Sequence, residues 1–326
     1  MSAERGFFDG IVEDGRPLLS LTAIALLLSG AFAIFLSIRR EFLPHDVAYL
    51  NMTAAQLCGI ADCRVVRFMF HDRVAFGGTL LAIAVLYLWL AAFPLRDGAR
   101  WAWWAFALSG TLGFGSFLAY LGYGYLDSWH GAATMALLPI FALGLKKSHR
   151  IASQSTRPWL PSADAKSDRA LRRLGRWGLL GTGLGMVGAG LTILILGTTR
   201  VFVPQDLAFI GLTRPELQAL NAHLIPLIAH DRAGFGGGLA SAGLLVALCA
   251  WYAKPGRAFK QAILVAGVAG FGSAIGVHYM EGYTDLAHLG PALAGAVLFL
   301  ISVSLEMLPW RSGSASTERG RLQSSF

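Results

Sequence analysis

Two short segments of the chain combine histidine, aspartate, arginine and glycine in the same order. Residues 71–78 read His-Asp-Arg-Val-Ala-Phe-Gly-Gly and residues 230–237 read His-Asp-Arg-Ala-Gly-Phe-Gly-Gly, so six of eight positions are identical. Imidazole nitrogens and carboxylates are common metal ligands, and the arginine fork binds carboxylates in a bidentate manner. The recurrence indicates two equivalent sites for a metal, a cofactor or another polar group.

Three further fragments recur in the same order, at an offset that stays between 157 and 160 residues. A period of this length is typical of a duplicated helical bundle, because solenoid units are only about 20–50 residues long. The shared positions are polar, aromatic or glycine, whereas most apolar positions between them differ. The matching fragments are Phe42–Ala48 with Phe202–Ala208, Gly113–Ser116 with Gly270–Ser273, and Tyr125–His130 with Tyr283–His288.

The composition is that of a membrane protein. Hydrophobic residues make up 55% of the chain and charged residues 14%, with a mean hydropathy of +0.56, whereas soluble domains carry about 25% charged residues. Because backbone groups in lipid have to pair within their own segment, the apolar runs are expected to be helices. We predict an all-α integral membrane protein with eight transmembrane helices in two tandem, parallel four-helix bundles. The expected spans are Leu18–Ile38, Val74–Leu95, Trp101–Gly124, His130–Leu145, Gly178–Thr199, Ala233–Ala253, Gln261–Met280 and Leu286–Leu308.

The positions of the basic residues predict the orientation. If both termini are cytoplasmic, the inner segments hold 19 of the 27 Lys and Arg, as the positive-inside rule requires. The net charge of +8 is then a matter of topology and of contact with anionic lipid, not of nucleic-acid binding. We predict a bacterial-type inner-membrane protein, with the duplicated polar motifs on the outer side. The expected divisions are 1–17 (cytoplasmic), 18–145 (first repeat), 146–177 (basic cytoplasmic linker), 178–308 (second repeat) and 309–326 (cytoplasmic tail).

The long loops after the first and fifth spans each contain a helix start signal. Thr53–Gln56 and Thr213–Glu216 read as capping boxes, in which Thr and Gln or Glu satisfy each other's backbone N–H groups. We therefore expect amphipathic helices over the outer mouth of each half. Such helices could be a shield for the bundle or a cap over a ligand.

Three cysteines are present. Cys58 and Cys63 lie close together in the first outer loop, where an oxidising compartment favours a disulfide. Two free thiols or a transient redox pair are the alternatives. Cys249 lies within the sixth span and is expected to be a small core residue.

The histidines are expected to act in pairs, because the outer ends of parallel spans lie at one depth. One imidazole from each of two facing helices is what a six-coordinate haem iron requires. Aspartates can orient ligand histidines, arginines can hold haem propionates, and glycines let a flat cofactor or another helix come close. The expected cofactor-binding residues are His71, His130, His230, His288, Arg73 and Arg232; the residues expected to orient them are Asp72, Asp127, Asp231, Asp285, Tyr125 and Tyr283; the expected close-approach positions are Gly77, Gly78, Gly236 and Gly237.

A bare zinc or copper site is the nearest competitor, since histidine and aspartate also bind these ions. A purely structural interpretation is open as well, with the aspartates as helix N-caps and the glycines as packing positions. His45, His223 and His278 have no histidine at the matching position of the other half, and we expect them to be structural or rim residues.

Eight spans in two halves, histidines at the outer ends of the even-numbered spans and a cysteine pair in the first outer loop resemble heme A synthase. The resemblance covers about residues 18–308 and implies haem as the cofactor and an oxidoreductase activity. It also implies His71 with His130 as one ligand pair and His230 with His288 as the other. The sequence departs from the family at Phe68, where the family has an acidic residue, and at Asp72, which is inserted between histidine and arginine.

Three functions from different classes follow from these patterns. The first is a haem-binding redox protein or haem-modifying enzyme. The second is a carrier or sensor for a small ligand, although few ionisable residues lie at mid-membrane, where coupling ions are handled. The third is a structural or assembly protein. No Walker loop, His-Glu-x-x-His motif or nucleophile elbow is present, and the expected partners are the lipid bilayer and haem or another small apolar ligand.

Overall fold

The computed structural model describes residues 14–119, 125, 128–153 and 169–306, and within these ranges all regular secondary structure is helical. Seven of the described helices are long and apolar enough to cross a membrane, which confirms an all-helical, multi-pass protein. Another long helix, α6, is rich in tryptophan and glycine. The long helices are α2 (Arg16–Arg39), α5 (Arg64–Ala92), α6 (Arg100–Ala119), α7 (Ser128–Ser153), α8 (Arg169–Gly197), α11 (Leu224–Tyr252), α12 (Arg257–Glu281) and α13 (Leu286–Glu306).

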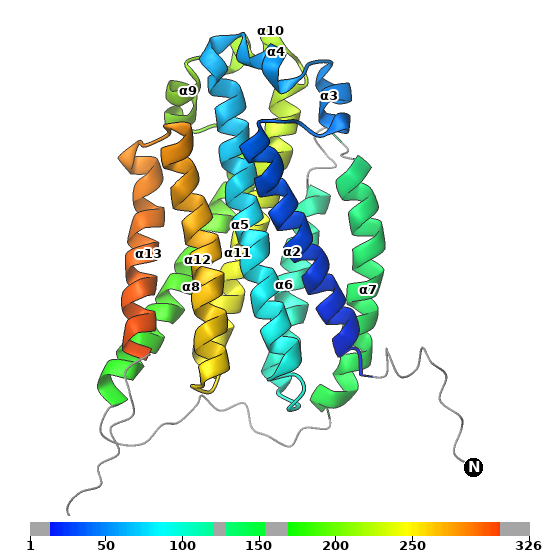
Figure 1. Cartoon of the computed structure of the whole chain (residues 1–326), viewed down its shortest axis with the longest axis vertical. Helices are drawn as coiled ribbons and strands as arrows, with labels where there is room; N and C mark the ends of the chain where they lie inside the picture. Colours follow the sequence, from blue (N-terminus) through cyan, green and yellow to red (C-terminus); the bar gives the residue numbers. More distant parts are fainter. Residues whose placement is uncertain (1–13, 120–124, 126–127, 154–168, 307–326) are drawn as a thin grey trace, which may run out of the picture.

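Four short helices lie together at one end of the bundle (Figure 1). They are α3 (Pro44–Leu50), α4 (Ala54–Cys58), α9 (Pro204–Ile210) and α10 (Arg214–Leu220). Both predicted capping boxes are present: the Thr53 hydroxyl accepts from the Gln56 N–H at 3.2 Å, and the Thr213 N–H donates to Glu216 at 2.7 Å. The inner faces of the short helices join an apolar cluster with the first turns of α5 and α11. The predicted helices over one end of the bundle are therefore present.

Helices α5 and α11 form the centre of the bundle and are mostly buried along their length. They also begin earlier than the sequence predicted, at Arg64 and Leu224 instead of Val74 and Ala233. The His-Asp-Arg segments consequently lie about two turns inside these helices, within regular backbone. The interpretation of Asp72 and Asp231 as helix N-caps is therefore wrong.

The helices of the two halves alternate around this centre. Helix α6 packs along α11 and α12 packs along α5, while α2 lies against α5 and α8 against α11 (Figure 1). The third helix of each half thus contacts the central helix of the other half. The contacts of α2 and α8 stay within their own half, as expected for two tandem four-helix bundles, whereas those of α6 and α12 cross between the halves.

The four predicted close-approach glycines lie at helix–helix contacts, two of them between the halves and two within a half. A Cβ at Gly78 would collide with Ser273 of α12, and a Cβ at Gly237 would collide with Ser116 of α6. Gly77 meets the backbone of α2, and Gly236 meets the backbone of α8. Each glycine therefore admits a neighbouring helix, which is one of the two roles expected for these positions.

Two loop predictions have mixed outcomes. Cys58 and Cys63 lie at disulfide-bonding distance in the segment between α2 and α5, and Cys249 is buried in α11. The predicted linker 146–177 is instead helical where it is described, since α7 continues to Ser153 and α8 begins at Arg169. The basic side chains at these ends do not interrupt the helices, because lysine and arginine are good helix formers.

Candidate functional site

The histidine of α5 meets histidines from the second half of the chain. Nε2 of His71 is 3.1 Å from Nε2 of His278 on α12, and the His71 ring centroid is 5.5 Å from that of His288 on α13. His71 and His278 are buried, and His288 is partly buried. One ring nitrogen of each lies within 4.8 Å of the other two. We call these three residues the histidine triad.

The histidine of α11 meets a histidine from the first half. Nδ1 of His130 on α7 is 3.3 Å from Nε2 of His230, and their rings are stacked with centroids 5.1 Å apart. The predicted pairs, His71 with His130 and His230 with His288, are therefore wrong. The structure joins one histidine of each half to a histidine of the other half because α6 and α12 pack on the opposite central helices.

The expectation that His278 is a structural residue does not account for its position. It had no matching histidine in the first half, so the comparison of the repeats passed over it. A usable signal was its place in the chain, since His278 follows the recurring Ser273 on the same span and precedes the recurring Tyr283 by five residues. His223, by contrast, lies at the rim, where its Nδ1 is 2.5 Å from the Tyr49 carbonyl oxygen.

Each arginine of the recurring segments lies between two carboxylates. Arg73 donates to Asp231 at 2.8 Å and to Asp46 at 2.7 Å, and these side chains are largely buried. These two carboxylates take Nε and Nη1 of Arg73, and the binding of a haem propionate by its other N–H groups stays a prediction.

The second arginine repeats this arrangement. Arg232 donates to Asp72 at 3.2 Å and forms an ion pair of 2.7 Å with Asp206. Its guanidinium carbon lies 4.8 Å from the centre of the Phe68 ring, in a cation–π contact. Phe68 stands at the position where heme A synthases have an acidic residue. Arg232 thus holds two carboxylates through Nε and Nη1, and its binding of a haem propionate also stays a prediction.

The aspartates beside the histidines orient the rings, as predicted. Asp72 lies 3.0 Å from Nδ1 of His71, and Asp231 lies 3.2 Å from Nδ1 of His230. Asp285 has a different role from the predicted one, because its carboxylate accepts the backbone N–H of His288 at 3.1 Å and caps α13. Asp127 lies outside the described residues.

Tyr125 and Tyr283 connect the short helices α3 and α9 to the histidine clusters. The Tyr283 hydroxyl donates to Asp206 at 2.8 Å and lies 3.2 Å from Nδ1 of His288. Burial, with a further contribution from the Asp206 carboxylate, raises the pKa of Tyr283, so its phenol stays protonated. Tyr125 donates in the same way to Asp46 at 2.8 Å. Asp46 and Asp206 were not among the predicted site residues, although they recur in the Phe-x-Pro-x-Asp fragments of both halves.

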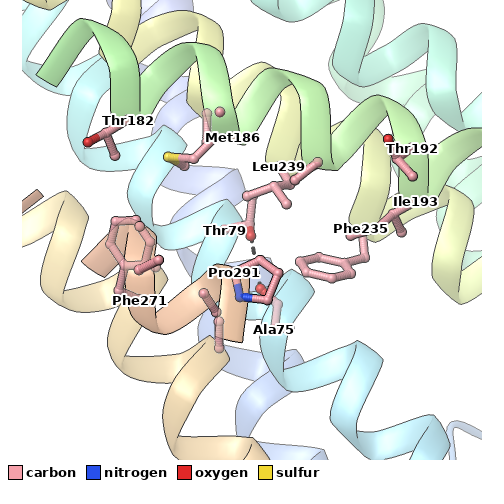
Figure 2. Close-up of a pocket in the computed structure, with 18 of the residues that line it drawn as sticks. Ala75, Thr79, Thr182, Met186, Thr192, Ile193, Phe235, Leu239, Phe271 and Pro291 are labelled. Carbon is pink, nitrogen blue, oxygen red and sulfur yellow. Dashed lines mark hydrogen bonds between the residues drawn. The ribbon is translucent and has the colours of Figure 1, made fainter. Parts of the chain in front are cut away.

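A chamber of about 700 Å³ lies between α5, α8, α11, α12 and α13, with the histidine triad in its lining. Figure 2 shows Phe235, Phe271 and Pro291 facing the same space from three helices. Thr79 and Thr182 also line the chamber, but their hydroxyls donate to carbonyl oxygens one turn back in their own helices. The chamber is therefore apolar along most of its walls and polar where the triad, Asp72 and Arg232 reach it.

Comparison with protein-family models, with curated proteins and with solved structures finds no match for this chain. The fold and the site define a multi-pass helical membrane protein with an intramembrane chamber beside a buried histidine cluster.

Proposed function

We propose that this chain is an inner-membrane protein that binds a lipid-soluble molecule in the chamber and holds the polar end of that molecule at the histidine triad. The proposal rests on how polar and apolar residues are distributed in the chamber. Most of its walls are apolar, and its polar groups are concentrated around His71, His278 and His288. A chamber of this size falls within the range of about 300–1,000 Å³ typical of small-molecule sites. An amphiphile with one small polar head matches both parts.

The proposed topology has eight transmembrane helices, with α6 as the span that supplements the seven strongly apolar helices. The basic residues support cytoplasmic termini and an outer location for the short-helix cap. Reporter fusions at Gly98 and Gly256 should read cytoplasmic, and fusions at Asn51 and Asn221 should read external. A cytoplasmic reading at Asn221 would invert the map and move the histidine triad to the inner side.

Haem is the second candidate for the chamber. It is favoured by the chamber volume and by histidines from separate helices at one end, since these can serve as axial ligands. The arrangement of the arginines speaks against it, because Arg232, the arginine in the chamber lining, already binds two carboxylates. A propionate would have to share the guanidinium with these two carboxylates, and its negative charge would be repelled by both.

A matched pair of glycine variants tests occupancy of the chamber. Gly185 and Gly188 lie on the same helix, and a Cβ at either meets no atom within 4 Å, but only Gly185 lines the chamber. Mass spectrometry of an organic extract of the detergent-purified protein identifies any bound molecule, and its absorption spectrum shows whether that molecule is haem. Gly185→Leu should reduce the amount bound by about tenfold or more, the effect of roughly 1.4 kcal/mol. Gly188→Leu should bind as the unmodified protein does.

Equal binding by both variants would contradict the proposal. A Soret band that disappears in Gly185→Leu and persists in Gly188→Leu would identify haem as the occupant. A colourless protein with a lipid-soluble molecule in the extract would favour the first candidate.

A further inference from the structure

We propose that His71, His278 and His288 bind one divalent transition-metal ion through their Nε2 atoms. The inference goes beyond the chamber ligand and does not depend on it. It rests on the hydrogen-bond partners of the three rings, which fix where each imidazole carries its proton. A neutral imidazole has one N–H donor and one lone pair, so a partner that can only accept settles which nitrogen is protonated.

The His71 proton is assigned to Nδ1. That nitrogen is 3.0 Å from one carboxylate oxygen of Asp72, whose other oxygen accepts from Arg232 at 3.2 Å. A carboxylate can only accept, so Nδ1 donates and Nε2 presents a lone pair.

The His278 proton is also assigned to Nδ1. Its Nδ1 is 2.6 Å from the carbonyl oxygen of Ala274, which can only accept. Its Nε2 therefore also presents a lone pair, and it faces Nε2 of His71 at 3.1 Å. Two lone pairs at this distance repel each other unless a cation lies between the two rings.

The third lone pair comes from His288. Its Nδ1 is 3.2 Å from the Tyr283 oxygen, and the Tyr283 proton is directed to Asp206 at 2.8 Å. The phenol oxygen consequently accepts from Nδ1, and Nε2 of His288 is left as a lone pair. One proton shared between His71 and His278 would satisfy those two rings only, whereas a metal ion accepts from all three.

Geometry and charge favour the ion. Nitrogen ligands at 2.0–2.1 Å in a tetrahedral zinc site lie roughly 3.3 Å apart, close to the 3.1 Å between His71 and His278. Ligand histidines also usually donate the other ring N–H to a carboxylate or carbonyl oxygen. Two carboxylates, Asp72 and Asp206, lie near the triad and share one cation, Arg232. The net charge of these three side chains is therefore negative, which favours a bound cation. Three protein ligands leave a fourth position open to the chamber.

The other histidine cluster makes a built-in comparison. Among the described residues it contains two histidines, His130 and His230, and the Nδ1 of one approaches the Nε2 of the other at 3.3 Å, as in a hydrogen bond between rings. We therefore expect one metal ion per chain, at the triad.

The test measures metal content on the full chain in detergent. After incubation with Zn²⁺ and removal of the excess, elemental analysis should give about one zinc per chain for the unmodified protein and for His130→Ala. His278→Ala should lose nearly all of it. Co²⁺ in place of Zn²⁺ should give the visible absorption bands of a four-coordinate site, and these should be absent in His278→Ala. The variant His278→Gln replaces the ring by a side chain of similar volume. Its melting temperature without metal should stay close to that of the unmodified protein, which shows that a loss of zinc is not caused by unfolding.

Zinc retained in full by a folded His278→Ala or His278→Gln would overturn the proposal. So would a haem spectrum that requires His71 and His288 but not His278. The test is separate from that of the chamber ligand, because Gly185→Leu should keep its zinc whether or not it binds a lipid-soluble molecule.

Discussion

Arg73 and Asp231 are 158 residues apart in the chain, yet Nε of the arginine donates to the aspartate at 2.8 Å between α5 and α11. The reciprocal pair, Arg232 with Asp72, joins the same two helices at 3.2 Å. Each aspartate also contacts the ring of the histidine that precedes it. The ion pairs that fasten the central helices to each other therefore also orient the first histidine of each cluster.

The first prediction concerns how much the ion pairs of Arg73 contribute to the free energy of unfolding. Replacing Arg73 by Met leaves Asp46 and Asp231 buried without their cation. Breaking a buried pair in this way typically costs about 3–5 kcal/mol, because an uncompensated charge remains. We expect a loss of this order in the free energy of unfolding, measured by denaturant titration in detergent micelles.

The exposed pair of Arg39 and Glu41 provides the control. Its nitrogen and oxygen are 3.0 Å apart, as in a good ion pair, but both side chains are more than half exposed. Arg39→Met should change the stability little, since exposed pairs contribute about 0–1 kcal/mol. Similar losses for the two variants would show that the buried pair does not stabilise the bundle.

The second prediction concerns the contact between α5 and α12. Gly78→Val would place a side chain against Ser273 and the Ala269 carbonyl oxygen, neither of which has room to move in a packed helix pair. Overpacking of this kind costs about 1–3 kcal/mol or more. We expect a lower yield of monodisperse protein in size-exclusion chromatography and a lower melting temperature. Gly272→Val on α12 is the matched control, because a Cβ there meets nothing within 4 Å, and it should behave as the unmodified protein.

Local features of this fold were predictable from the sequence, and contacts between distant segments were not. Apolar runs and the Thr53 and Thr213 capping boxes act within a few residues, so their patterns are readable directly. The recurrence also located His71, Asp72 and their copies. It could not say which copy each one meets, because a match between halves gives equivalent positions but not the partner across the bundle.

His278 illustrates the limit of this reasoning. Its importance comes from α12 lying against α5, a contact made through Gly78 and Ser273. Both residues were recognised as recurring, yet a glycine at a packing position fits any small neighbour. Nothing in the chain itself therefore joined His278 to His71 before the helices were placed.

The third prediction concerns the disulfide between Cys58 and Cys63. Alkylation of the native protein without reductant should leave Cys58 and Cys63 unlabelled, and mass spectrometry should find them linked. Closing so short a loop stabilises by about 2 kcal/mol in the chain-entropy view, so Cys63→Ser should lower the stability by that amount. The loop after α8 has no cysteine pair, so reductant should affect only the first loop. Labelling of both thiols in the native protein would contradict the linkage.

The fourth prediction concerns Tyr283 as a positioning residue for His288. Tyr283→Phe removes the oxygen that accepts from Nδ1 of His288 and the proton that goes to Asp206. The His288 ring then loses its fixed tautomer, so zinc affinity should fall by about 10–100-fold, the usual effect of removing a partner of a metal ligand. Competition with a chelating dye measures this, and the Co²⁺ bands should weaken or shift in the same variant. Tyr125→Phe is the control, because Tyr125 makes the equivalent bond to Asp46 at the other cluster. If both variants bind zinc as the unmodified protein does, Tyr283 has only a structural role; if both lose affinity equally, the effect comes from the cap and not from the orientation of His288.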